Sequence, residues 1–287
     1  MMSPARYRDF WGAVGEQFPD LSGAASTHYY ADNEQRLFTE HFPPLNGLSI
    51  LKTDLWDEAR NTRIMVWARD RGARTFGVDI SMPTVLLARD AFGSTHPGRG
   101  LGAAAGDVRD LPFCDGAFDA IYSMGTIEHF AETERAVAEM LRVLKPGGRA
   151  IIGVPNRHDP FLRPLLATVM QAVGAYSYGY EKSYSRTALR HMLQRAGFEV
   201  IDETAILFMP GWLRMLDLAC HAWCRPLAPV TAALLMPFAY LDRHVPAVRR
   251  HGYLLATVVR KPAIAEPAPA TARRRSVGRT TLDRSAG

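Results

Sequence analysis

The sequence predicts a doubly wound α/β protein with a seven-stranded, mostly parallel sheet. Apolar runs of strand length alternate with amphipathic runs of helix length along most of its 287 residues. The first unit spans 48–81 and consists of an apolar run, an acidic turn, a helical stretch and a second apolar run ending in Asp79. Two strands joined by a helix in about thirty residues form a right-handed βαβ unit. In such a sheet the ligand crevice lies at the carboxyl ends of the strands.

The elements follow in order after an N-terminal helical cap, which is expected over residues 1–47. Strands are expected at 48–51, 75–80, 101–105, 118–123, 149–154, 198–201 and 253–259. Between them, one helix is expected around Ile64 and ends at Gly72, and others are expected at 81–92, 132–144 and 184–196. Ser185 is expected to cap the last of these helices.

Two segments depart from this alternation. Residues 205–251 are apolar and broken by prolines, and their longest uncharged run, 226–241, is shorter than the about 20 residues of a bilayer span. We expect a helical insertion before the last strand, acting either as a substrate lid or as a peripheral membrane contact, because tryptophans there accompany arginines. Residues 262–287 are rich in Ala, Pro and Arg and are expected to form a disordered basic tail.

Composition excludes several classes of protein. Apolar residues make up 47% and charged residues 22% of the chain, as in ordinary globular proteins. The tail holds five arginines against two acidic residues and so accounts for most of the net charge of +5, and no nucleic-acid partner is indicated. Three cysteines make no disulfide framework, and the first 18 residues lack a signal-peptide core. A cytoplasmic location is expected, with membrane association through 205–251 as the alternative.

Four segments have the order and spacing of a known family: Gly77–Ser81, Gly106–Phe113, Phe118–Phe130 and Leu144–Gly148. Together they resemble the class I S-adenosylmethionine (SAM)-dependent methyltransferases, in particular the branch that includes quinone-biosynthesis and related small-molecule enzymes. The resemblance covers 45–201 and 252–260. It implies a Rossmann-like methyltransferase fold, with a SAM-binding domain formed by 48–204 and 252–261.

The resemblance also implies a SAM site at the ends of the second, third and fourth strands. It places Asp79 on the ribose hydroxyls, Ile80 against the adenine, Asp107 on the adenine amino group, Val108 beside that ring, and Ser123 and Met124 beside the methionine portion. Carboxylates suit a diol and an exocyclic amine because they accept hydrogen bonds from both.

The loop after the first strand departs from the family pattern. The family's first motif is rich in glycine because the backbone approaches the cofactor closely, yet 48–71 contains no glycine. The acidic residues of this loop would repel a pyrophosphate, which disfavours a nicotinamide or flavin dinucleotide. They would attract the ammonium and sulfonium of SAM, so Asp54 or Asp57 is expected to bind the amino group. Alternatively, the bulk of Trp56 abolishes SAM binding.

The residues after the fourth strand supply a candidate base. His129 has the side chain whose usual pKa suits proton removal from a hydroxyl near neutral pH. Its alternative role is to cap or pack against the following helix. Glu128 is expected either to orient His129 or the substrate, or to be a solvated carboxylate at a helix start.

The acceptor pocket is expected to involve His28, Tyr29 and Tyr180. Residues 27–30 hold a dense group of hydrogen-bonding rings. These rings either pack a helix on the sheet or form a lid in which Tyr29 or Tyr30 closes over the ligand.

The predicted function is SAM-dependent methylation, at oxygen, of an apolar small-molecule or lipid-like acceptor selected by 205–251. The sulfonium is already activated, so the protein mainly has to align donor and acceptor and exclude water; no metal is needed. Two alternatives remain. The acidic cluster at 54–58 could hold Mg²⁺ in a lyase or cyclase on a methyltransferase scaffold, or a non-catalytic methyltransferase-like protein could dock through its insertion.

Overall fold

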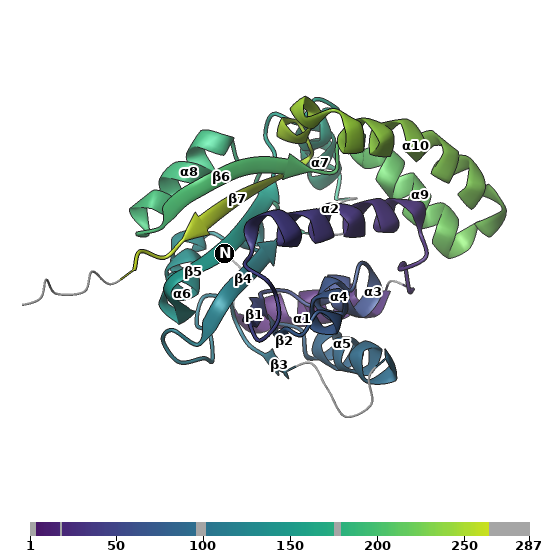
Figure 1. The fold of residues 1–287 in the computed structure, drawn as a ribbon. Coiled ribbons are helices and arrows are strands. Elements are labelled where there is room, and N and C mark those ends of the chain that lie inside the picture. Colours follow the sequence, from purple (N-terminus) through teal and green to yellow (C-terminus); the bar gives the residue numbers. More distant parts are fainter. Residues whose placement is uncertain (1–3, 18, 96–101, 175–178, 264–287) are drawn as a thin grey trace, which may run out of the picture.

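The computed structural model describes residues 4–17, 19–95, 102–174 and 179–263, which form an α/β structure around a seven-stranded sheet (Figure 1). The strand order is β3-β2-β1-β4-β5-β7-β6, and β7 runs antiparallel to both of its neighbours while the other pairs are parallel. The strands are β1 Ser49–Lys52, β2 Arg74–Asp79, β3 Gly102–Ala105, β4 Phe118–Met124, β5 Leu144–Pro155, β6 Glu199–Ile206 and β7 Leu254–Arg260. The predicted fold class is confirmed.

Helices cover both faces of the sheet, as side-chain alternation along its strands requires. Ile50 packs in a core with residues of α2, α4 and α5, whereas the next residue, Leu51, packs in a second core with residues of α6 and α8. The helices are α1 Pro4–Gln17, α2 Ala25–His41, α3 Trp56–Arg60, α4 Ile64–Asp70, α5 Met82–Thr95, α6 Thr133–Val143, α7 Arg163–Ala172, α8 Arg186–Arg195, α9 Gly211–Trp223 and α10 Ala228–His244.

The apolar insertion is helical and packs on the N-terminal α2. Figure 1 shows α9 and α10 as a pair beside one end of α2. Buried polar contacts join them: the Asp217 carboxylate accepts hydrogen bonds from the Ser26 amide (2.7 Å) and the Thr231 hydroxyl (2.6 Å). Asp242 of α10 pairs with Arg36 of α2 at 2.8 Å. Buried polar contacts therefore join α2 and the insertion directly.

Several boundaries differ from the sequence prediction. Residues 53–58, expected to form a turn, contain the start of α3. The β5 strand begins at Leu144 because residues 145–148 form a bulge, seen as a register shift against β4. The β6 strand continues to Ile206, so the insertion begins later than expected. Ser185 caps α8 as predicted, accepting from the Ala188 amide at 3.2 Å.

Some predictions lie outside the described residues, among them the loop at 96–100 and nearly all of the tail at 262–287. Within the part of the chain that the structure describes, none of the helices combines the length and hydropathy needed to cross a bilayer.

Candidate active site

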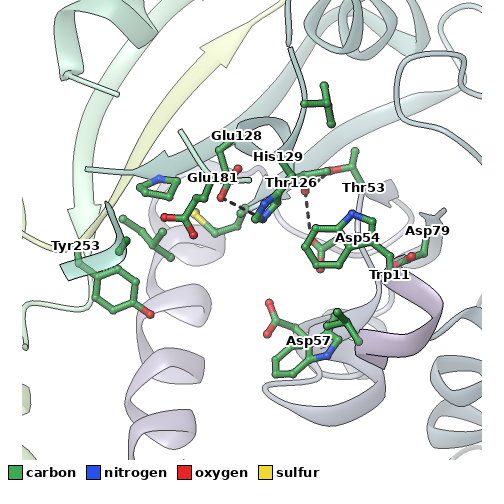
Figure 2. Close-up of a pocket in the computed structure, with 18 of the residues that line it drawn as sticks. Trp11, Thr53, Asp54, Asp57, Asp79, Thr126, Glu128, His129, Glu181 and Tyr253 are labelled. Atoms are coloured by element: carbon green, nitrogen blue, oxygen red, sulfur yellow. Dashed lines mark hydrogen bonds and ion pairs between the residues drawn. The ribbon is translucent and has the colours of Figure 1, made fainter. Parts of the chain in front are cut away.

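A cavity of about 510 Å³ lies at the carboxyl ends of β1 to β5. The strand order reverses between β1 and β4, which is where ligands bind in open α/β sheets. One wall consists of the loops after β1, β2 and β3. The opposite wall comes from α7, α9 and β7 and is largely apolar: Leu166, Ala167, Met170, Trp212, Met215, Leu218 and Leu254. Arg163 of α7, Arg214 of α9 and Glu181 also line the cavity. Residues of α1, including Trp11, also border the cavity, as Figure 2 shows.

The loop after β1 is built around a buried lysine. Lys52 is fully buried, and its Nζ lies 3.3 Å from Asp54 Oδ1, 3.7 Å from Asp57 Oδ2 and 3.9 Å from Glu58 Oε1. We refer to Lys52, Asp54, Asp57 and Glu58 as the Lys52 cluster. Asp54 and Asp57 also line the cavity, while Glu58 turns inward to accept from the Met65 amide at 3.2 Å. Asp54 and Asp57 therefore pair with Lys52 and also line the cavity.

The charges of the Lys52 cluster are strongly coupled. Burial alone would lower the pKa of Lys52, but the neighbouring carboxylates outweigh it and raise that pKa. Burial raises the pKa of Asp54 to about 6 and that of Glu58 to about 7. Lys52 therefore stays charged, whereas Asp54 titrates just below neutral pH.

One bulky side chain of the glycine-free loop, that of Leu55, turns away from the cavity. Leu55 is fully buried and packs on Gly77 of β2, where any Cβ would clash with the leucine side chain. The Leu55 amide donates to Asp79 Oδ2 at 2.9 Å, and the Ser81 amide donates to Asp79 Oδ1 at 2.8 Å. Each oxygen of Asp79 keeps further acceptor capacity. Asp79 and Ile80 both line the cavity, as does Trp56.

Asp107 and Val108, which follow β3, also line the cavity. The Asp107 carboxylate accepts hydrogen bonds from Arg109 Nε at 2.9 Å and Arg109 Nη2 at 2.6 Å. Burial alone would raise the pKa of Asp107, but the Arg109 guanidinium outweighs it and holds that pKa below its usual range. Arg109 in turn lies 5.5 Å from the Tyr7 ring centroid of α1. Asp107 therefore reaches the cavity as an ionised, partly engaged carboxylate.

His129 and Glu128, at the short helical turn after β4, reach the cavity from the side of that strand (Figure 2). His129 Nδ1 lies 2.9 Å from the Tyr180 carbonyl oxygen, so in the neutral ring Nδ1 carries the proton and Nε2 is the acceptor. The ring packs edge-on against Trp11, and burial lowers the pKa of His129. Glu128 is buried, which raises its pKa well above the usual range. Burial therefore favours the uncharged forms of both side chains.

Of the remaining predicted site residues, one lines the cavity and the others do not. Met124, at the end of β4, lines the cavity, whereas Ser123 is fully buried and does not. His28 is exposed and Tyr29 is buried in the core, and neither borders the cavity. The Tyr180 side chain is exposed and borders a smaller neighbouring pocket.

The structure adds cavity residues that the sequence did not single out as binding residues. Thr126 lies between Thr53 (3.3 Å) and Asp54 (3.5 Å), and these contacts join the loops after β1 and β4. Tyr30, rather than its neighbour Tyr29, faces the cavity, and Tyr253 does so from the start of β7. In the sequence, the aromatic run at 27–30 pointed to Tyr30 as a lid residue, whereas no pattern pointed to Tyr253 or Thr126 as binding residues.

The fold and the site together define a cofactor-binding α/β domain with methyltransferase topology. A family model described as "Methyltransferase domain" matches residues 59–152. The demethylmenaquinone methyltransferase of Thermus thermophilus is 32% identical over 168 residues, covering 51% of this chain and 73% of that protein. The chain belongs to the SAM-dependent methyltransferase family, and its family cofactor is SAM.

Other similar proteins match a smaller share or only the fold. The O-methyltransferase cnsE of Penicillium expansum is 32% identical over 136 residues, 47% of this chain and 47% of cnsE, so the match spans about half of that relative. A SAM-dependent methyltransferase of Mesorhizobium loti has a TM-score of 0.53 at 17% identity, covering 84% and 100% of the two chains. The [4+2]-cyclase SpnF has a TM-score of 0.56 at 20% identity, covering 82% and 81%. At such identities the structural matches show the fold alone.

Proposed function

We propose that this protein methylates a hydroxyl oxygen of an apolar small-molecule or lipid-like acceptor, with SAM as the donor. The observation that carries the proposal is the division of one cavity into an acidic end and an apolar end. The acidic end lies at β1, β2 and β3, and the largely apolar end lies at α7 and α9. His129 and Glu128, which follow β4, lie between the two ends in the strand order of the sheet. The names of the two relatives, an O-methyltransferase and a quinone methyltransferase, support it.

The acidic end fits SAM in chemistry. The volume of the whole cavity, about 510 Å³, is within the roughly 300–1,000 Å³ of small-molecule sites. The residues that would hold SAM are Asp54 and Asp57 for the amino group, Asp79 for the ribose, Ile80, Asp107 and Val108 for the adenine, and Met124 for the methionine portion. Bound there, SAM supplies an activated methyl group. The protein's part is to orient the two reactants and exclude water.

His129 is proposed as the base that accepts the acceptor's hydroxyl proton. With Nδ1 donating to the Tyr180 carbonyl, Nε2 carries the lone pair that takes this proton. Burial lowers the pKa of His129, which favours the neutral ring that a base requires. Glu128 Oε2 has no hydrogen-bond partner among the described residues, and burial raises the pKa of this carboxyl group, so its protonated form could hold the acceptor oxygen.

The two alternatives have less support. For a metal-dependent lyase or cyclase, the Lys52 ammonium already occupies the centre of the acidic cluster that would have to hold Mg²⁺. For a non-catalytic partner protein, a cavity with an acidic and an apolar end would have no role. We also propose a cytoplasmic small-molecule enzyme rather than one acting on nucleic acid, with peripheral membrane contact through the insertion.

The proposal is tested with SAM labelled in its methyl group. The protein is incubated with apolar phenols and quinols, each paired with its O-methyl ether and with a hydrophilic phenol, and products are identified by mass spectrometry. We expect label on oxygen of the apolar free hydroxyls only. Methylation confined to the hydrophilic phenols, or SAM binding without transfer to any hydroxyl, would contradict the proposal.

A further inference from the structure

Helices α7, α9 and α10 lie near one another at one end of the molecule (Figure 1). All three expose large apolar side chains. We call this surface the α7–α9–α10 face. Its most exposed members include Leu165, Val169, Trp212, Trp223, Leu234 and Met236, of which Trp223 is 70% and Met236 68% exposed. Scattered exposed apolar residues are ordinary, but a continuous set on three neighbouring helices indicates an interaction surface.

The face is continuous because the three helices are packed together. Phe161, before α7, lies 5.2 Å from Phe208, before α9, and 5.6 Å from Phe238 of α10, measured between ring centroids. The face also leads into the cavity. Trp212 and Met215 are 53% and 45% exposed on the outside, yet both line the cavity. An apolar molecule lying on this face would therefore be in contact with side chains that also line the cavity.

Exposed charges on the face are of one sign. Throughout the described lengths of α7, α9 and α10 the acidic residues are Asp217 and Asp242, which are only 1% and 2% exposed. The exposed Arg225, in the turn between α9 and α10, makes no ion pair among the described residues. On the other side, Arg157 and Lys182 border a small polar pocket beside α7. Cationic side chains thus flank an apolar surface.

We propose that the α7–α9–α10 face docks on an anionic phospholipid bilayer and takes the acceptor from it. Tryptophan and leucine side chains would enter the headgroup boundary, and the flanking cations would lie among anionic headgroups. The inference rests on the proposed function for the identity of the acceptor, while lipid binding itself requires no methyl transfer. A symmetric second copy fits the face less well, because it would bring the same cationic flanks together.

The test measures sedimentation of the full chain with vesicles of phosphatidylcholine, with and without phosphatidylglycerol. We expect binding to anionic vesicles that weakens with added salt, and little binding to neutral vesicles. Arg225→Gln should weaken binding roughly fivefold. Trp223→Ser combined with Leu227→Ser should weaken it more than about tenfold. None of these residues lines the cavity, so SAM affinity should stay unchanged.

The matched control replaces two exposed apolar residues of α5, Met82→Ser with Leu86→Ser, each 52% exposed and outside the face. The control should bind vesicles like the parent protein. Absence of vesicle binding, an equal loss in the control, or a concentration-dependent dimer abolished by the face variants would each overturn the inference. If vesicles bind but no hydroxyl is methylated, the proposed function fails alone; if methylation occurs without vesicle binding, only this inference fails.

Discussion

Asp54 is one of the residues at which the glycine-free loop lines the cavity, and its raised pKa should make SAM binding depend on pH if it binds the SAM ammonium. Only the ionised carboxylate attracts the SAM ammonium, and the pKa of Asp54 is about 6. SAM affinity should therefore rise roughly tenfold between pH 5 and pH 7, as the ionised fraction does. Calorimetric titration across this range measures the effect.

The matched variant is Asp54→Asn, which keeps the shape but cannot ionise. It should bind SAM more weakly at pH 7 and lose most of the pH dependence. A parent protein with flat affinity from pH 5 to 7, or a variant that retains the full slope, would show that Asp54 does not meet the ammonium. The assignment of the amino group would then pass to Asp57.

His129 is expected to affect turnover rather than cofactor binding. His129→Gln should lower kcat by roughly 10²-fold or more, because general-base assistance is lost, while the Kd for SAM stays nearly constant. The rate of the parent enzyme should rise with pH through a pKa below the usual histidine value, since the neutral ring is the active form. Equal activity of the variant, or an unchanged acidic limb in its pH profile, would contradict the assignment.

The sequence predicted which residues lie at the strand ends better than it predicted where their side chains point. Asp79 followed from where its strand ends, and the family resemblance implied Asp107 and Met124. Ser123 was placed wrongly with respect to the cavity because successive residues of a strand point to opposite faces, and only one of Ser123 and Met124 can line it. Tyr30 lines the cavity and Tyr29 does not, because consecutive residues of a helix also point in different directions. Their roles toward substrate and cofactor stay predictions.

The Lys52 cluster holds together the loop after β1, which contains no glycine. Lys52→Met leaves three carboxylates without their cation, so the free energy of unfolding should fall by about 3–5 kcal/mol at pH 7.5. The loss should be smaller near pH 5, where Asp54 and Glu58 take up protons because their pKa values are about 6 and 7. Urea unfolding at both pH values measures this. A loss that is equal or larger at pH 5 would contradict the cluster's electrostatic role.

The buried carboxylate of Asp217 joins the insertion to α2 through hydrogen bonds. Asp217→Ala removes the acceptor for the Ser26 amide and the Thr231 hydroxyl, which should lower the free energy of unfolding by roughly 1–3 kcal/mol. Limited proteolysis should then cut first within 205–251. Thr39→Ala, on the exposed side of α2, is the control and should change neither result. Unaltered cleavage in the Asp217 variant would mean that α9 is held by apolar packing alone.

At the level of elements, apolar periodicity predicted all seven strands and the helices α4, α5, α6 and α8, but not α7 between β5 and β6. It did not predict α3, because Asp57 and Glu58 look like turn residues until Lys52 is known to be buried beside them. Nor did it predict that α2 packs with α9 and α10, since Ser26 and Asp217 are 191 residues apart. Local patterns define elements, whereas long-range polar pairs are visible only in three dimensions.

The whole molecule has an α/β core and one cavity with an acidic end and a largely apolar end. Its fold was predictable from four short segments and the alternation of strands and helices. The cavity's shape was not, because α1, α7 and α9 come from distant parts of the chain. The central claim is that this cavity, despite lacking a glycine-rich loop, binds SAM.

Calorimetric titration of the full chain with SAM and S-adenosylhomocysteine tests that claim most directly. We predict binding of one molecule per chain, and loss of most of the affinity in Asp79→Ala. Because Asp79 also accepts from the Leu55 and Ser81 amides, thermal unfolding must first show that the variant is folded at the titration temperature. No binding to the folded parent protein, or full affinity in the folded variant, would contradict the account.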